Sequence, residues 1–319
     1  MTILDIVIQG TDDASGALKS VDSSLGKLGG TAGKAAAVGL GLATGAVLAV
    51  GAAAVGAGVA ALNLSTDIDS ATNNIAAQLG ISQDEAAGFE DVMKGIFKNN
   101  FGESFDDISK AVVTVSQGLG EMPDAALQGI AEDAFALRDA FEIDIGQSVT
   151  GAKALIEAFG VDGEQAMDFI ASGMQNGLNA SGDFIESIGE YSNLFSEAGF
   201  SADEMYNIMA SGAQAGILGT DKIADAVKEM GIILLEGGDD TKAAFDTIGL
   251  SFDDIAGSIA TGDETWADYF DNIIGGLNEI EDPMERSKAQ VAIFGTMAED
   301  LGVSFTEGLS AAQSGRSKQ

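Results

Sequence analysis

The stretch from residue 35 to residue 66 carries no charged side chain, and it constrains the fold of this chain more than any other feature. From residue 35 to residue 62 it consists of Ala, Val, Leu and Gly, with Thr44 as the one exception. At ~1.5 Å per helical residue, about 20 residues cross the ~30 Å hydrocarbon core of a bilayer, so the stretch is long enough to span one. A glycine costs about 1 kcal/mol relative to alanine in a helix, so this glycine-rich stretch needs partners to stay helical.

Small residues recur at intervals of four residues, with one interval of three, within this stretch. The residues of this small-residue face are Ala37, Gly41, Gly45, Ala49, Ala52, Gly56 and Ala60. Their spacing builds a smooth helix face on which a second helix can pack closely, so we expect them to mediate membrane insertion or helix packing. Two interpretations stay open: the segment inserts into a bilayer with its preceding lysines on the cytoplasmic side, or it is buried against copies of itself or inside a tube.

The residues before this stretch do not form a secretory signal, because the leading region would extend to residue 34 and contain four aspartates. Apolar residues at positions 3–8 and a glycine at position 10 predict a short strand or extended arm at the start of the chain. We therefore predict five parts. They are an extended arm and helix (1–33), a Gly/Ala-rich apolar, candidate transmembrane segment (34–66), a helical-hairpin repeat domain (67–235), a C-terminal helical part (236–302) and a frayed or truncated end (303–319).

Composition excludes several kinds of chemistry. The chain has no cysteine and no histidine, which removes disulfides, thiolate nucleophiles, the Ser-His-Asp triad and most zinc sites. With 15 basic and 50 acidic residues, the net charge is 15 − 50 = −35. Phosphate backbones repel such a chain, so we expect no direct nucleic-acid binding. The acidity is spread over the sequence, which is typical of solvated helix faces and also of adaptation to high salt.

Helix-terminating signals recur at a roughly constant spacing of about forty positions between 67 and 235. They are L-G-I-S (79–82), L-G-E-M-P (119–123), F-G-V-D (159–162) and A-G-F-S (198–201), with a second set, F-G-E-S, I-G-Q-S, A-S-G-D and L-G-T-D, midway between them. Each joins a glycine that ends one helix to a residue that opens the next. The best internal match places F-I-A-S-G-M-Q-N-G-L (169–178) over I-M-A-S-G-A-Q-A-G-I (208–217). The pattern predicts an all-α fold of stacked helical hairpins; duplication without such a stack is the alternative.

Two features mark the C-terminal part. E-G-G-D (236–239) predicts a flexible hinge, and D-P-M-E (282–285) predicts the start of a helix with Asp282 as its N-cap. The apolar stripe of that helix is expected to continue as far as Met297.

Four separated phrases resemble, in the same order, the conserved core of the tape measure proteins of tailed phages. They are M-K-G-I-F-K-N-N-F-G-E-S (93–104), G-E-Y-S-N-L-F-S-E-A-G-F-S (189–201), L-G-T-D-K-I-A-D-A-V-K-E (218–229) and D-P-M-E-R-S-K-A-Q-V-A-I-F-G-T-M-A-E-D-L-G (282–302). The resemblance covers roughly residues 67–302. The extended start, the lysine-bearing S-V-D-S-S-L-G-K-L-G phrase and the apolar segment are similar as well.

The resemblance implies a structural protein of the virion tail, made in the host cytoplasm, that lies inside the tail tube and sets tail length during assembly. It implies self-association, contacts with tail tube and tail assembly chaperone proteins, and insertion into the host membrane during genome delivery. Family members are commonly far longer: at ~1.5 Å per residue, 319 residues reach roughly 480 Å as one continuous helix. We therefore expect a fragment, a truncated prophage product or the first part of a longer ruler. The alternatives are a pore-forming protein that uses residues 35–62 and a host-encoded helical scaffold.

No catalytic, cofactor or metal site is expected. Glu103 is the best single carboxylate for glycosidase chemistry, but it stands where a helix start favours negative charge, and aromatic residues that would line a sugar cleft are scattered. E-G-G-D-D-T (236–241) lacks the ligand spacing of a calcium loop, and G-L-G-L-A-T-G (39–45) has no preceding strand or following Lys-Ser or Lys-Thr to bind phosphate.

Overall fold

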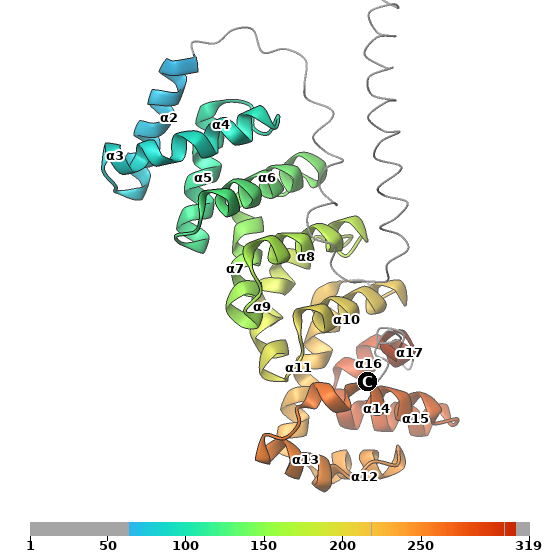
Figure 1. Ribbon diagram of the computed structural model, residues 1–319. Helices are drawn as coiled ribbons and strands as arrows, with labels where there is room; N and C mark the ends of the chain where they lie inside the picture. Colours follow the sequence, from blue (N-terminus) through green and yellow to red (C-terminus); the bar gives the residue numbers. More distant parts are fainter. Residues whose placement is uncertain (1–63, 218, 303, 311–319) are drawn as a thin grey trace, which may run out of the picture.

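The computed structural model describes residues 64–217, 219–302 and 304–310, and this part of the chain is built of helices and turns (Figure 1). In chain order the first elements are α2 (Leu64–Leu79), α3 (Gln83–Ala86), η2 (Ala87–Phe89), α4 (Glu90–Lys98), α5 (Phe105–Leu119), α6 (Asp124–Phe141), α7 (Ile145–Phe159), α8 (Gly163–Gln175) and α9 (Phe184–Glu197). They are followed by α10 (Ala202–Gln214), α11 (Thr220–Glu236), α12 (Asp239–Thr247), α13 (Phe252–Thr261), α14 (Trp266–Glu279), α15 (Pro283–Phe294), α16 (Met297–Leu301) and α17 (Phe305–Ser310). The prediction of an all-α fold is confirmed for the described residues. The arm, the apolar segment and residues 311–319 lie outside them.

The helices lie in two rows that together form an elongated stack (Figure 1). One row contains α2, α5, α7, α9 and α11, and the other contains α4, α6, α8 and α10; each helix packs against the next helix of its own row. The chain alternates between the rows, so that consecutive helices such as α5 and α6, or α7 and α8, also pack together. α15 contacts α11, and α17 contacts α10, so the C-terminal helices continue from the end of the stack.

The turns that separate these helices follow from the recurrent sequence signals. Gly80, Gly120, Gly160 and Gly199 follow the ends of α2, α5, α7 and α9, and their φ angles of 69°, 84°, 68° and 92° are ones that side-chain-bearing residues rarely adopt. Capping boxes then open α3, α8 and α10 through the pairs Ser82–Glu85, Asp162–Gln165 and Ser201–Glu204. The second set of signals is less regular, because the cap of α7 is Asp144, before I-G-Q-S.

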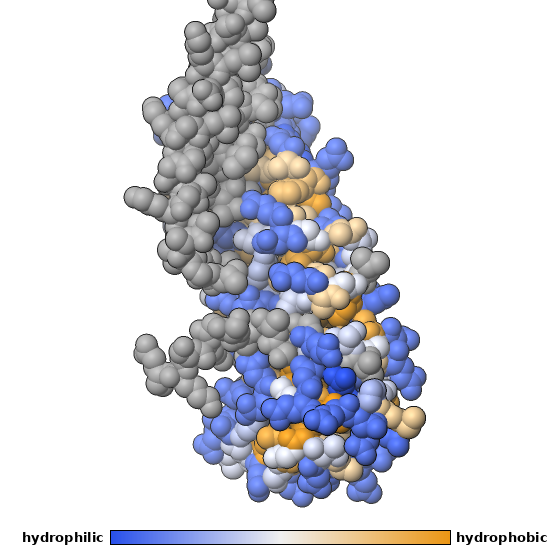
Figure 2. All heavy atoms as spheres, turned by 90° about the vertical axis from the view of Figure 1, so that its right-hand side faces the viewer, coloured by the Kyte–Doolittle hydropathy of each residue, from blue (hydrophilic) through white to orange (hydrophobic). Residues whose placement is uncertain are grey.

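Buried apolar side chains form one cluster along the stack, from Ala71 to Leu309. In its middle, the ring of Phe169 stacks on Phe184 at 6.1 Å between centroids and meets Tyr206 edge-on at 5.3 Å. On the face shown in Figure 2, apolar residues appear as separate patches among hydrophilic ones. The predicted boundary between residues 235 and 236 stays a prediction. Here Gly237 ends α11 in the left-handed region at φ 61°, and α12 begins two residues later.

The expected extent of the helix that begins at Pro283 is wrong. Asp282 does cap α15, accepting hydrogen bonds from the Met284 and Glu285 N–H groups, but the helix ends at Phe294, so Met297 begins the separate helix α16. Gly295, at φ 60°, breaks the helix where a Cβ atom would lie 2.8 Å from the Glu229 side chain of α11.

The frayed or truncated end at residues 303–319 stays a prediction; within it, residues 305–310 form α17. Phe305 and Leu309 are both only 1 % exposed, and Phe305 meets the ring of Phe294 edge-on at 5.1 Å. These two apolar side chains, four residues apart, give the short helix a buried face against α10 and α14.

Candidate interaction surfaces

The predicted small-residue face, residues 37–60, lies outside the described residues. None of the helices in the described part of the chain combines the length and the apolarity that crossing a bilayer requires. The structure therefore bears on function through the surfaces of the helical stack, which offers two grooves and two carboxylate pairs.

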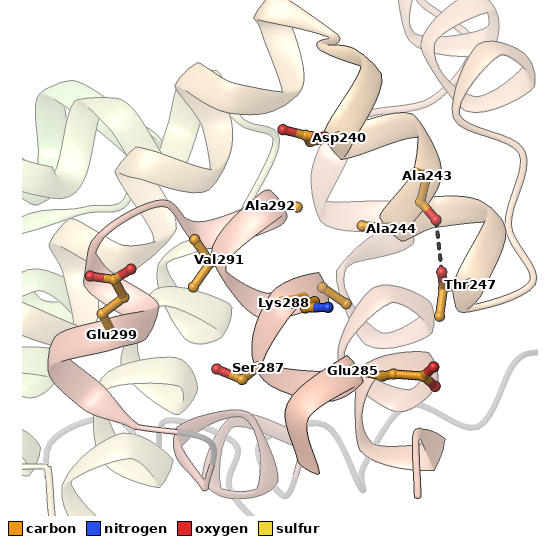
Figure 3. Close-up of a pocket in the computed structure, with 11 residues that line it drawn as sticks. Asp240, Ala243, Ala244, Thr247, Glu285, Ser287, Lys288, Val291, Ala292 and Glu299 are labelled. Carbon is orange, nitrogen blue, oxygen red and sulfur yellow. Dashed lines mark hydrogen bonds between the residues drawn. The ribbon is translucent and has the colours of Figure 1, made fainter. Parts of the chain in front are cut away.

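The larger groove, here called the α12–α15 groove, has a volume of about 780 Å³ (Figure 3). The residues that line it are Asp240, Ala243, Ala244 and Thr247 of α12, Glu285, Ser287, Lys288, Ala289, Val291 and Ala292 of α15, and Glu299 of α16. The Thr241 hydroxyl donates a hydrogen bond of 3.1 Å to the Ala292 carbonyl and ties the two helices together. Small side chains dominate the walls, and Lys288 partly neutralises the acidic side chains around them.

The smaller groove, here called the amino-terminal groove, has a volume of about 470 Å³ and lies at the first turns of the stack. Its apolar residues are Leu79, Ile81, Phe89, Met122 and Leu127. The remaining lining residues are Glu85, Ser116, Gly120, Glu121 and Asp124. It differs from the α12–α15 groove because its apolar side chains are large and its charged side chains are all acidic.

One carboxylate pair lies between α6 and α8. Asp168 is only 4 % exposed, and Asp133 is half-buried. Burial raises the pKa of Asp133 to about 7, and the negative charges of Asp168, Glu164 and Glu132 act in the same direction. This carboxyl group therefore changes its charge near neutral pH.

The second pair links the starts of α9 and α11. Asp183 accepts hydrogen bonds from the Ser181 hydroxyl at 2.5 Å and the Thr220 hydroxyl at 3.1 Å, and so holds the first residue of α11. Burial raises the pKa of Asp183, but the hydrogen bonds from Ser181, Asp221 and Thr220 outweigh it and leave this pKa below its ordinary value. Burial and the hydrogen bond to Asp183 raise the pKa of Asp221. Asp183, at the start of α9, therefore caps the start of α11 by accepting from the Thr220 and Asp221 N–H groups.

The residues that the sequence analysis weighed for chemistry lie in separate parts of the described chain. Glu103 precedes the N-cap residue Ser104 of α5, as its position in the sequence suggested, and Trp266, Tyr191 and Tyr206 are buried in the core. No group of three acidic, cysteine or histidine side chains that could hold a metal ion occurs among the described residues.

Sequence reasoning did not find the grooves or the Asp133–Asp168 pair, because their residues come from different helices. A signal for the pair was present, since Asp168 interrupts the apolar run A-M-D-F-I-A (166–171) on a helix that the sequence predicts to be half-buried. Burial of a charged carboxylate is unfavourable, so such a position indicates a neighbouring polar or ionisable group in the same buried region.

Comparisons with known proteins agree with the resemblance noted from the sequence. Residues 97–295 match the model of a family described as "Phage-related minor tail protein". The "Probable tape measure protein" of Streptomyces phage phiC31 is 28 % identical over 138 residues. That match covers 43 % of this chain and 19 % of the phage protein, so it spans about a fifth of the relative's length.

No solved structure is significantly similar to the chain. The family match itself covers more than half of the sequence and runs from the end of α4 to the residue after α15, that is, along most of the described stack. The chain therefore belongs to the phage-related minor tail protein family, and the predicted relationship to phage tape measure proteins is confirmed.

Proposed function

We propose that this chain is a non-enzymatic structural protein that acts in tail assembly and in setting tail length, from a place inside the tail tube. The observation that carries the proposal is the family match over residues 97–295, which overlaps most of the two-row helical stack. The partners implied are the tail tube protein, the tail assembly chaperones and other copies of this chain. The alternative of a host-encoded scaffold is not retained, because the chain belongs to a phage tail family.

We further propose that the stack is made of a helical pair that repeats every 39 residues, the separation of Gly173 and Gly212 (212 − 173 = 39). A Cβ atom on Gly173 of α8 would overlap the ring of Phe184, and one on Gly212 of α10 would lie 2.5 Å from Cδ1 of Ile223. Gly212 follows Gly173, and Ile223 follows Phe184, by the same 39 residues. The Leu178 N–H donates to the Gly173 carbonyl at 2.9 Å, and the Ile217 N–H donates to the Gly212 carbonyl at 3.1 Å, again at this offset. The same interlocking contact thus recurs in successive pairs.

The assembly role is tested in the phage or prophage that carries the gene. A stop codon in place of Lys94 removes nearly all of the stack, and we expect it to abolish tails of normal length, as seen by negative-stain electron microscopy. Supplying the full chain from a plasmid should restore them, and mass spectrometry of purified tails should detect its peptides. Normal tails from the stop-codon mutant would contradict the assignment.

A role in passage of the genome through the host membrane is a second proposal, supported by the absence of charge from residues 35–66. Alanine and glycine give a modest hydrophobic gain, and the −35 charge opposes approach to an anionic bilayer. We therefore expect weak leakage from anionic liposomes at neutral pH and low salt, and more leakage when salt screens the charge. Deletion of residues 35–62 should abolish leakage; leakage that persists would exclude this segment as its source.

The small-residue face is proposed to mediate contact between copies of that segment. Replacement of Gly45 by Leu should weaken self-association of a peptide spanning residues 34–67 in detergent, because the added bulk blocks close approach of two backbones. Unchanged association would show that the glycines do not form the contact.

A further inference from the structure

The amino-terminal groove presents large apolar side chains that the stack leaves partly uncovered. Leu79, Ile81, Phe89 and Met122 are each only partly buried, although they pack against the core. In the A-G-F-S turn the corresponding side chain is covered: Phe200 is 3 % exposed and meets Phe195 and Phe270, whereas Val161 of F-G-V-D is partly buried. The groove therefore lacks a cover that a later turn has.

The charge around the groove indicates the chemistry of the segment that could cover it. Glu85, Glu121 and Asp124 line the groove with exposed carboxylates, and no lysine or arginine is among the lining residues. An apolar surface with an acidic rim favours a partner that carries apolar and basic residues together.

Residues 17–34 of this same chain have that chemistry. Leu18, Val21, Leu25 and Leu28 recur at intervals of three, four and three residues, the spacing of one apolar helix face. The segment also contains three lysines, at positions 19, 27 and 34, and a single acidic residue, Asp22, in a chain that otherwise carries a large excess of negative charge.

The length of the connecting chain permits the contact. Residue 34 is joined to α2 by residues 35–63, and the groove begins at Leu79, the last residue of α2. The 16 residues of α2 span about 24 Å, whereas the connecting stretch 35–63 spans about 44 Å even when helical. The segment can therefore reach the groove of its own chain.

We propose that residues 17–34 dock in the amino-terminal groove, with their leucines against Leu79, Phe89 and Met122 and their lysines near Glu85, Glu121 and Asp124. The α12–α15 groove is the poorer match, because its apolar side chains, four alanines and one valine, are small and it already contains Lys288. The docked segment covers the first turns of the stack and competes with any other chain for them.

The absence of cysteine from the chain makes a disulfide test specific. The full chain carries Ser24→Cys in the segment and Ser116→Cys in the groove, and disulfide formation is followed under mild oxidant. The matched control pairs Ser24→Cys with Ala243→Cys in the α12–α15 groove. A disulfide requires Cα atoms within about 7 Å, so only a docked segment gives rapid cross-linking.

We expect rapid cross-linking to position 116 and at least tenfold slower cross-linking to position 243. Glu121→Lys with Asp124→Gln should slow the first reaction about tenfold, and Lys19→Glu with Lys27→Glu should restore part of the rate. Leu25→Ser should slow it at least tenfold without changing the circular dichroism of the stack. These variants alter exposed residues or the segment, so the fold is retained.

Mixing two single-cysteine chains shows where the segment comes from. If the segment docks in its own chain, the double-cysteine monomer should cross-link internally at a rate that does not depend on protein concentration. If the mixture instead gives cross-linked dimers rapidly, the segment docks in a second copy, which would overturn docking within one chain. Equal rates at positions 116 and 243, or a rate that neither the charge changes nor Leu25→Ser alters, would overturn the proposal altogether.

Discussion

The contact between α8 and α9 at Gly173 provides a quantitative test of the packing. A Cβ atom at this position would overlap Cε1 and Cζ of Phe184. That ring is fully buried and stacked on Phe169, so it has little room to move. We therefore expect Gly173→Ala to force a shift of the whole helix pair.

Two opposing effects set the magnitude. Overpacking a core by a methyl group typically costs about 1–3 kcal/mol, whereas alanine gains about 1 kcal/mol over glycine in a helix. The net expectation is a loss of about 0–2 kcal/mol in the free energy of unfolding. Gly189→Ala is the matched control, because Gly189 is exposed in α9 and a Cβ atom there meets nothing within 4 Å. It should raise stability by about 0.4–1 kcal/mol.

The assay is urea unfolding of the full chain, monitored by far-ultraviolet circular dichroism. A double-mutant cycle with Phe184→Leu isolates the contact, because the smaller side chain leaves room for the new methyl group. We expect Gly173→Ala to cost less in that background than in the wild type, with a coupling of about 1 kcal/mol or more. If Gly173→Ala stabilises the chain as much as Gly189→Ala does, the close approach of α8 and α9 is wrong.

Three further predictions follow from individual contacts. The Asp133 pKa is raised to about 7, above its unfolded value near 4, so its contribution to stability is present below pH 4 and is lost as the pH rises through 7. Asp133→Asn should therefore stabilise the chain at pH 8 by roughly 1–4 kcal/mol and flatten the pH dependence of stability between 4 and 7 in urea titrations. The exposed control Asp91→Asn keeps Asp133 and should keep the loss of stability that Asp133 causes. Arg138 donates from Nη1 to both carboxylate oxygens of Asp107 at 2.9 Å and from Nε to Asp139, so Arg138→Lys should cost about 1 kcal/mol because an ammonium group does not reproduce this fixed geometry, measured as a lower urea midpoint. Asp282→Ala should cost about 1 kcal/mol by removing the cap of α15, and Asp282→Ser should recover most of the loss; no loss would show that the cap is dispensable.

Local signals in the sequence predicted the helices well. Gly80, Gly120 and Gly160 mark helix ends because positive φ angles strongly favour glycine. After Gly80 and Gly160, a serine or aspartate then satisfies free N–H groups of the next helix. These requirements act within a few residues, so they are visible without the fold. The Asp282–Pro283 helix start was predicted for the same reason.

Features that depend on packing between helices could not be predicted. α15 ends at Phe294 because the chain passes closely over α11 at Gly295, and α17 forms because Phe305 and Leu309 find a buried surface on α10 and α14. Both surfaces are supplied by residues distant in the sequence. The two grooves escaped prediction in the same way, since each joins side chains of separate helices.

The length of tails built with an altered stack tests the central claim most directly. Deletion of residues 145–183 removes one helical pair and joins Asp144 to Phe184, so that one aspartate replaces another, Asp183, before α9. If the pair acts as a ruler with its helices laid end to end, tails should shorten by about 58 Å, and by about 10 Å if it acts as a folded layer. A duplication of the same residues should lengthen tails by the same amount. Intact tails of unchanged length from both variants would contradict the claim that the stack sets tail length.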